Sequence, residues 1–375
     1  MTDRKSYAAL VDGIFGVGTA AFDVNQSQTN NVIGALANSG QFVEFTANFE
    51  QRLRRLAAAV VADRTLRKEI VAALQKLVTS EWDGTYAELC ALDYFLADAA
   101  TGPGNVVLDR TVPSTDTLAS EMGMTNANHD LRFPGLGVSM DTKLLSDKIG
   151  GILEGIFNDF RKSKGIKSLT ILPSFDRDED FSIYKANRMN LLNELVQGVD
   201  INIKPAELVS QVISGLSYVF AWNPGVISAE SSYSPVEHAK NHHRLLFTHA
   251  KKFSKVEPTV IVFVLFPWTD ERVFYFDDTT KVFFKEYGDQ FFFGYLASGD
   301  PAKKFNNKFT SAMSAGDVTK HLSGVLYLVD DSVLAKTFND VNVKASYLWN
   351  PNAVHALAGS PLEASLKARG AFDLR

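Results

Sequence analysis

The chain has 375 residues, of which 46% are hydrophobic and 22% charged, the composition of an ordinary globular protein with two or three domains. A single cysteine excludes an intrachain disulfide and predicts a reducing, cytoplasmic compartment. The first six residues show no signal peptide, and no apolar run reaches the ~18 residues of a membrane span. The net charge of −5 offers no overall electrostatic support for nucleic-acid binding, so local basic clusters would have to provide it.

The first 80 residues predict a helical N-terminal module. Residues 1–40 are polar and contain several glycines, and the run from Asn25 to Asn31 predicts a loop. Residues 44–79 contain no glycine or proline. They predict one long helix or two shorter helices with a broad apolar stripe.

The next predicted element is a helix between Glu81 and Ala97. Apolar residues recur there at helical spacing, and Asp83 or Thr85 is a candidate N-cap. Glu88 lies in the first turns of this helix. A glutamate at a helix start is favoured by the helix dipole alone, so its position does not by itself indicate a functional site.

A β-hairpin is predicted between Asn128 and Leu145. The sequence Pro134-Gly135-Leu136-Gly137 is typical of a turn, and both flanks alternate apolar and polar residues as half-buried strands do. With this four-residue loop, Phe133 pairs with Val138, Leu131 with Met140, and Asp130 with Asp141. A slip of one residue would move Asp130 to the other face.

The predicted register sorts the side chains of the hairpin onto two faces, because residues two apart share a face of a strand. Like charges in direct opposition are destabilising, so Asp130 and Asp141 facing each other require a reason, and a divalent cation with oxygen ligands is the obvious one. The polar face would carry Asp130, Arg132, Ser139, Asp141 and Lys143, and the apolar face Leu131, Phe133, Met140 and Thr142.

Residues from about 145 to 235 contain a strand-like segment at 168–172 and a helical segment from Tyr184 to Gln197. Residues 236–254 then predict one amphipathic helix that begins near Pro235. The apolar run from Pro258 to Phe266 predicts a strand buried on both faces.

Three histidines in the predicted helix, His238, His242 and His249, resemble a stripe of metal ligands. No HExxH motif accompanies them, and one cysteine cannot build a thiolate site. Solvated histidines, or histidines that face DNA, are the favoured interpretation over zinc.

The chain becomes rich in aromatic residues after about residue 271, in the groups Phe274 to Phe276, Phe283-Phe284 and Phe291 to Phe293. The core of an α+β tail packed on the main domain is the favoured interpretation. A homodimer or partner-protein interface is the alternative. Residues 323–329 predict a further buried strand.

An early-helix glutamate, then an aspartate, then D-x-K on a strand resembles the PD-(D/E)XK nuclease superfamily. The matching positions are Glu88, Asp130, Asp141 and Lys143, and His129 stands where the name of the family has proline. The resemblance covers roughly residues 80–270. The late helix and buried strand fit the way in which several members complete their core sheet.

The resemblance implies a site for Mg²⁺, with Mn²⁺ able to replace it. Asp130 would be the central ligand, Asp141 and the backbone carbonyl of Thr142 would bind beside it, and Glu88 would bind directly or through water. Lys143 would orient or deprotonate water, or neutralise charge on the phosphate. Arg132, Lys251 and Lys252 are candidate nucleic-acid contacts; an ion pair that offsets the opposed carboxylates is an equally weighted interpretation of Arg132.

The expected fold is therefore α/β, an α+β mixed sheet with a restriction-endonuclease-like core at 81–270, an insertion at about 145–235, the helical module at 1–80 and an α+β extension at 271–375 packed on the core. The expected function is metal-dependent hydrolysis of nucleic acid, most readily as a DNA endonuclease in restriction or phage defence. A catalytically silent nucleic-acid- or protein-binding module of the same fold is the alternative, and a structural scaffold that uses the aromatic tail is a third.

Overall fold

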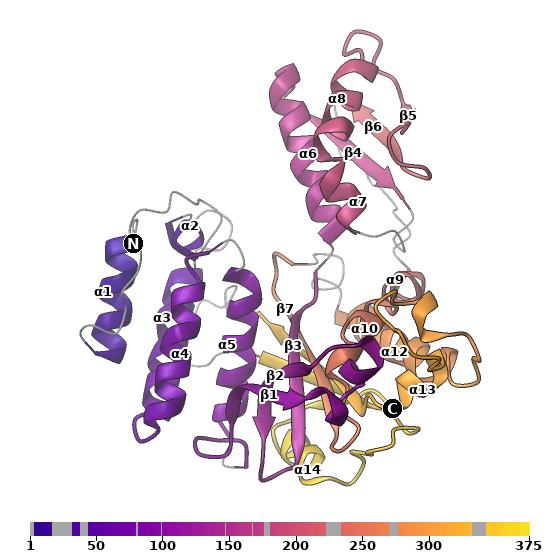
Figure 1. Ribbon diagram of the computed structural model, residues 1–375. Helices are drawn as coiled ribbons and strands as arrows, with labels where there is room; N and C mark the ends of the chain where they lie inside the picture. Colours follow the sequence, from indigo (N-terminus) through magenta and orange to yellow (C-terminus); the bar gives the residue numbers. More distant parts are fainter. Residues whose placement is uncertain are drawn as a thin grey trace. The chain divides into compact units, whose positions relative to one another are not determined.

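The computed structural model describes residues 4–16, 32–37, 44–79, 82–98, 100–146, 148–166, 168–175, 181–222, 234–269, 277–331 and 343–375. The chain divides into two compact units (Figure 1). The first comprises residues 1–145 and 243–375, and the second comprises residues 146–242. Both mix helices with strands, so the α/β class expected from the sequence is confirmed.

A mixed seven-stranded sheet is the centre of the first unit. Strands β1, β2 and β3 are antiparallel, β3, β7 and β8 are parallel, β9 is antiparallel to β8, and β10 is parallel to β9. The strands, in sheet order, are β1 Val107–Pro113, β2 Asn126–Phe133, β3 Val138–Leu144, β7 Thr259–Leu265, β8 Gly324–Asp330, β9 Val343–Trp349 and β10 Phe372–Asp373.

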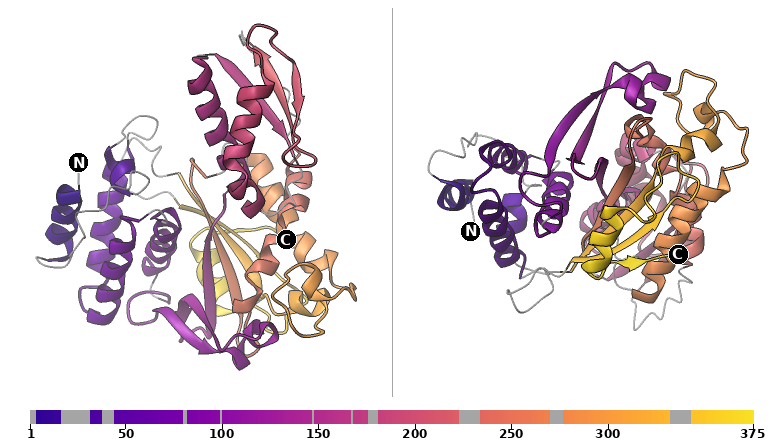
Figure 2. Two further views of the ribbon diagram at one scale, coloured as in Figure 1. Left: turned by 45° about the horizontal axis from the view of Figure 1, so that its top comes forward. Right: turned by 90° about the horizontal axis from the view of Figure 1, so that it is seen from below.

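Helices cover both faces of this sheet, as Figure 2 shows. One face packs on the helices that precede β1 and on α14 (Pro361–Ala368), and the other packs on α12 (Asp277–Gly294). The helices of this unit are α1 Arg4–Phe15, α2 Val32–Ala37, α3 Phe45–Ala59, α4 Arg64–Lys76, α5 Trp82–Leu96, η1 Ser114–Asp116, η2 Leu118–Met122, α10 Leu245–Thr248, η3 Ala250–Lys252, α12 Asp277–Gly294, η4 Ala302–Lys304, α13 Ala315–Lys320 and α14 Pro361–Ala368.

The two-helix alternative for residues 44–79 is the one that the structure adopts. Asp63 is the N-cap of α4. Its side chain accepts a hydrogen bond from the backbone N–H of Leu66 at 2.9 Å, which satisfies an otherwise free N–H of the first turn. Leu66, Ile70 and Leu74, four residues apart, then bury one face of α4. The predicted loop at Asn25–Asn31 lies outside the described residues.

The N-terminal helices share one apolar core with the sheet. Buried side chains of α1, α3, α4 and α5 belong to the same cluster as Leu131, Met140 and Val262. Residues 1–80 are therefore not a separate module in the structure, because their apolar side chains share one core with α5 and the sheet.

The predicted strand at 258–266 is β7, and all seven of its residues are buried. Residues 323–329 form β8, its neighbour. The boundary expected at residue 271 therefore differs from the structure. The parallel pairing of β7 and β8 makes the C-terminal residues part of one sheet, whereas the prediction places them in an extension packed on the core.

The aromatic side chains of α12 are largely buried. Phe283, Phe284, Phe291 and Phe292 are each at most 1% exposed, so burial within the unit makes them unavailable to a partner subunit. Phe293 is 45% exposed. Residues 274–276 lie outside the described residues. The core interpretation of this region is therefore confirmed for the four buried phenylalanines.

The single helix predicted at 236–254 is wrong. The chain instead forms α9 Pro235–His242, α10 and the short η3. Tertiary hydrogen bonds explain the break near the end: the carbonyl of Lys252 contacts His129, and the carbonyl of Phe253 accepts from the backbone of Leu118. The three histidines of the proposed stripe consequently do not share one helix.

The second unit contains an antiparallel three-stranded sheet in the order β4-β6-β5, with helices against one face. Its elements are α6 Lys148–Lys164, β4 Leu169–Ser174, α7 Phe181–Ala186, α8 Arg188–Gly198, β5 Glu207–Val209, β6 Ser217–Trp222 and α9. The insertion expected at about 145–235 falls within this unit. Among the described helices of the whole chain, none is both long and apolar enough to cross a bilayer.

Candidate active site

The hairpin has the predicted register for its two apolar pairs, whereas the predicted pairing of Asp130 with Asp141 is absent from the ladder. Phe133 pairs with Val138, and Leu131 pairs with Met140. These four side chains all belong to the apolar core beneath the helices, which is the predicted division of the two faces. The polar face follows from it, because Ser139 and Asp141 alternate with Val138 and Met140 along β3.

Strands β2 and β3 separate just beyond this pairing. The ladder between them ends at Leu131 and Met140, while β2 continues to pair with β1 as far as Asn126. The side chain of Asp130 bridges the gap, since its Oδ2 accepts the backbone N–H of Thr142 at 2.8 Å. This hydrogen bond holds the Asp130 carboxylate against the strand that carries Asp141.

Two lysines join the two carboxylates. The Nζ of Lys143 lies 2.9 Å from Asp141 Oδ1, 2.8 Å from the carbonyl oxygen of Thr142 and 3.5 Å from Asp130 Oδ2. The Nζ of Lys252, from η3, lies 2.8 Å from Asp130 Oδ1 and also contacts Asp141 Oδ1. One nitrogen touches both carboxylates, so they are near enough to share a cation.

Burial and charge act on the two carboxyl groups in opposite directions. Burial, then the charge of Asp141, raises the pKa of Asp130 despite the nearby lysines. Burial also opposes ionisation of Asp141, but Lys143 and Lys252 outweigh it and lower the pKa of Asp141. A proton held by this pair would therefore reside on Asp130.

Glu88 projects from α5, the helix that packs against β3 (Figure 1). Burial, then repulsion by Asp130, raises the pKa of Glu88 to about 7, and Lys143 partly offsets this. Asp130 and Lys143 therefore both act electrostatically on the Glu88 carboxyl group. It makes no hydrogen bond or ion pair with those side chains among the contacts of the described residues.

The donor set suits a hard divalent cation in part. Asp141 is fully buried, and its Oδ2 has no hydrogen-bond partner among the described residues; the Nδ1 of His249 lies 4.0 Å from this oxygen. Two carboxylates and the Thr142 carbonyl are oxygen ligands of the kind that Mg²⁺ prefers. Within the described ranges, no group of three or more His, Cys, Asp and Glu side chains has the spacing of a metal site.

The three candidate nucleic-acid contacts occupy different settings. Arg132 forms a bidentate ion pair with Glu257, at 2.8 Å from Nη2 to Oε2, so the ion-pair interpretation holds with a partner other than the opposed carboxylates. Lys252 lies inside the carboxylate cluster. Lys251, beside it in the chain, is half-buried.

Two side chains important to this geometry have no signal in the local sequence. His129 is 1% exposed, and its Nε2 donates to the carbonyl of Lys252 at 2.7 Å. Glu257 binds both Arg132 and the hydroxyl of Ser139. Each contact joins residues more than 115 positions apart, so hairpin periodicity could not reveal it.

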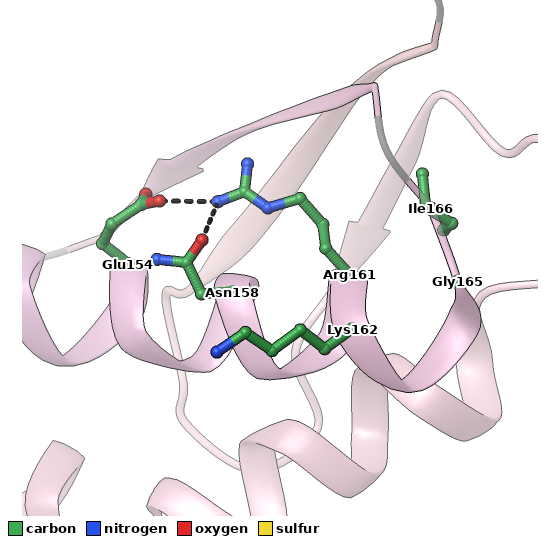
Figure 3. Close-up of a pocket in the computed structure, with 6 residues that line it drawn as sticks. All are labelled: Glu154, Asn158, Arg161, Lys162, Gly165 and Ile166. Atoms are coloured by element: carbon green, nitrogen blue, oxygen red, sulfur yellow. Dashed lines mark hydrogen bonds and ion pairs between the residues drawn. The ribbon is translucent and has the colours of Figure 1, made fainter.

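The second unit has a surface pocket at the end of α6, drawn in Figure 3. Arg161 lines it, and its guanidinium is already bound by Glu154 at 2.5 Å and by Asn158 at 3.1 Å. These contacts make Arg161 part of a local polar network.

Comparisons of the chain with protein-family models, with curated proteins and with solved structures give no match.

Proposed function

We propose that this protein is a metal-dependent nuclease of the PD-(D/E)XK type, which hydrolyses phosphodiester bonds of nucleic acid, with DNA as the first substrate to test. The observation that carries the proposal is the convergence of Asp130, Asp141 and Lys143 at the point where β2 and β3 separate. A restriction-endonuclease-like core and a role in restriction or phage defence belong to the same proposal, and they come from the superfamily resemblance.

The residues that would hold Mg²⁺ are Asp130, Asp141 and the carbonyl of Thr142, and Glu88 would bind directly or through water. When bound, the cation would lower the pKa of a coordinated water and stabilise negative charge on the phosphate. The unpartnered Oδ2 of Asp141 supports this donor set, because a buried anionic oxygen is stabilised only by a cation or a hydrogen bond.

Lys143 would act on the substrate side of the site. Its side chain is 26% exposed, and its ammonium lies 2.9 Å from Asp141 Oδ1. In this position it would donate a hydrogen bond to the attacking water or to a phosphate oxygen. Glu88, with a pKa of about 7, would hold or release a proton near neutral pH.

A second candidate function is a catalytically silent module that binds nucleic acid or protein. The observation that favours it is the ammonium of Lys252, which already neutralises both carboxylates. In this alternative the cluster is a buried ion-pair network that stabilises the junction of β2, β3 and η3.

The deciding experiment compares cleavage of plasmid, linear duplex, single-stranded DNA and RNA, each with Mg²⁺, Mn²⁺ or EDTA. We expect cleavage only with metal. We expect Asp141→Ala and Lys143→Ala to lower the rate roughly 100-fold or more. Asp159→Ala, at an exposed carboxylate of the second unit, is the matched control and should cleave normally.

Cleavage that persists unchanged in both site variants would reject the site assignment. Absence of cleavage for every substrate, together with retained binding of nucleic acid, would favour the silent module.

A further inference from the structure

Lys252 lies where a cation shared by the two carboxylates would lie. Its Nζ is 2.8 Å from Asp130 Oδ1 and in contact with Asp141 Oδ1, and its side chain is only 11% exposed. A lysine that extends into solvent from a basic surface would be much more exposed. The ammonium is therefore an internal group of this site.

The backbone around Lys252 is held in place independently of the ammonium. His129 binds the Lys252 carbonyl at 2.7 Å, and the next carbonyl, of Phe253, accepts the N–H of Leu118 at 2.9 Å. Because a carbonyl oxygen can only accept, the His129 Nε2 must carry the proton. Two tertiary hydrogen bonds thus position η3 so that its last residue points at the carboxylates.

The charges of the cluster are balanced without metal. Asp130 and Asp141 contribute two negative charges, and Lys143 and Lys252 contribute two positive charges. Both ammonium groups contact Asp141 Oδ1, and at Asp130 Lys143 lies by Oδ2 and Lys252 by Oδ1. A divalent cation added to this arrangement would meet two ammonium groups at close range. Its binding therefore requires that at least one of them moves away.

Of the two ammonium groups, that of Lys252 better matches the position of a cation shared by both carboxylates. It contacts both carboxylates directly, whereas Lys143 lies 3.5 Å from Asp130 and also binds the Thr142 carbonyl. Lys143 is also the more exposed side chain. Removal of Lys252 would therefore expose the shared oxygens while the D-x-K motif stays intact.

We propose that Lys252 is an internal counter-ion that competes with the divalent cation for Asp130 and Asp141, and so weakens metal binding by this site. The inference rests on the proposed function, since it takes the same carboxylates as the metal ligands. Lys252 acts here as a positioning residue that sets metal affinity.

Binding of Mn²⁺ measured by titration calorimetry, without nucleic acid, tests this inference. We expect Lys252→Met to bind Mn²⁺ about tenfold more tightly than the unmodified protein. Lys252→Arg, which keeps the charge, should bind as weakly as the unmodified protein. Lys185→Met, at an exposed lysine of the second unit, is the control and should leave the affinity unchanged.

Thermal unfolding gives a second readout. In EDTA, Lys252→Met should melt at a lower temperature than the unmodified protein, because two buried carboxylates lose a counter-ion. Mn²⁺ should raise the melting temperature of Lys252→Met by more than it raises that of the unmodified protein. Lys252→Gln, which keeps a hydrogen-bond donor without the charge, replaces Lys252→Met in both measurements if the methionine variant is poorly folded.

The outcomes separate the two proposals. Equal or weaker Mn²⁺ binding by the folded, uncharged variant, with clear binding by the unmodified protein, overturns the role of Lys252 and leaves the metal site standing. No Mn²⁺ binding by any of the proteins overturns the metal site and the competition together.

Discussion

The backbone N–H of Thr142 donates to Asp130 Oδ2 at 2.8 Å, where the ladder between β2 and β3 has already ended. At this position a hydrogen bond from the β3 backbone to the side chain of Asp130 takes the place of a backbone hydrogen bond between β2 and β3. It satisfies a buried N–H and fixes the carboxylate beside Asp141 at the same time. Stability and site geometry therefore depend on one side chain.

The two roles of Asp130 can be separated by substitution. Asp130→Asn keeps an oxygen for the Thr142 N–H, and the raised pKa of Asp130 indicates that a neutral side chain is tolerated there. We expect this variant to lose Mn²⁺ binding with little change in the free energy of unfolding. Asp130→Ala leaves the N–H unpaired and should lose about 1–3 kcal/mol. Urea unfolding in EDTA, with both variants side by side, measures the difference.

Equal unfolding free energies for the asparagine and alanine variants would contradict this role of the hydrogen bond.

Glu88 should give the unfolding free energy a distinct dependence on pH. Its pKa in the folded protein is about 7, raised from an ordinary value of 4.5 by burial and by Asp130. Between these values the folded state holds a proton that the unfolded state releases, so stability falls as pH rises. We expect a loss of up to about 3 kcal/mol between pH 4.5 and pH 7.

Glu88→Gln removes this titration and isolates it from that of other groups. In EDTA, the glutamine variant should match the unmodified protein near pH 4.5 and exceed it in stability at pH 8. Parallel pH profiles of the two proteins, measured by urea unfolding, would show that Glu88 titrates normally.

The hairpin was predictable because its information is local. The Pro134-Gly135 turn and the alternation of the flanks determine which of Asp130, Leu131 and Met140 face the core, and these residues all lie between positions 130 and 140. The buried strands β7 and β8 were likewise visible as apolar runs. Nothing comparable in the sequence marks where η3 packs.

The position of Lys252 was not predictable, because it depends on contacts between residues over 100 positions apart. The apolar periodicity predicts one helix through residues 236–254. In the structure, His129 and Leu118 bind backbone carbonyls near the end of this segment. The same limit applies to the boundary at residue 271. The pairing of β8 with β7 is a property of the sheet, and the sequence of either strand alone does not show it.

A second ion-pair cluster joins α3 to α5 and to the sheet. Arg52 is 1% exposed and binds Asp93 at 3.2 Å, Asp330 at 2.6 Å and the hydroxyl of Tyr86. Arg52→Met removes a guanidinium from two buried carboxylates, and we expect a loss of about 3–5 kcal/mol in the free energy of unfolding. Urea unfolding at neutral pH measures it.

Arg54, two residues away, is the matched control for Arg52. Its side chain is 62% exposed and pairs with Glu50 on the same helix. Arg54→Met should change the free energy of unfolding by less than about 0.5 kcal/mol. Similar losses for the two arginines would show that the buried cluster contributes no more than a surface pair.

Gly324, at the start of β8, permits the close approach of β9. A Cβ at this position would overlap the indole of Trp349 and lie 3.0 Å from the carbonyl oxygen of Leu348. Gly324→Ala should therefore destabilise the protein by about 1–3 kcal/mol, since the neighbours are a bulky ring and backbone. Gly135→Ala, in the hairpin turn with no atom within 4 Å of its Cβ, should stay within roughly 0.5 kcal/mol of the unmodified protein. Thermal and urea unfolding of the two variants test the contrast, and an undiminished stability of Gly324→Ala would show that β9 can move away from β8 without loss.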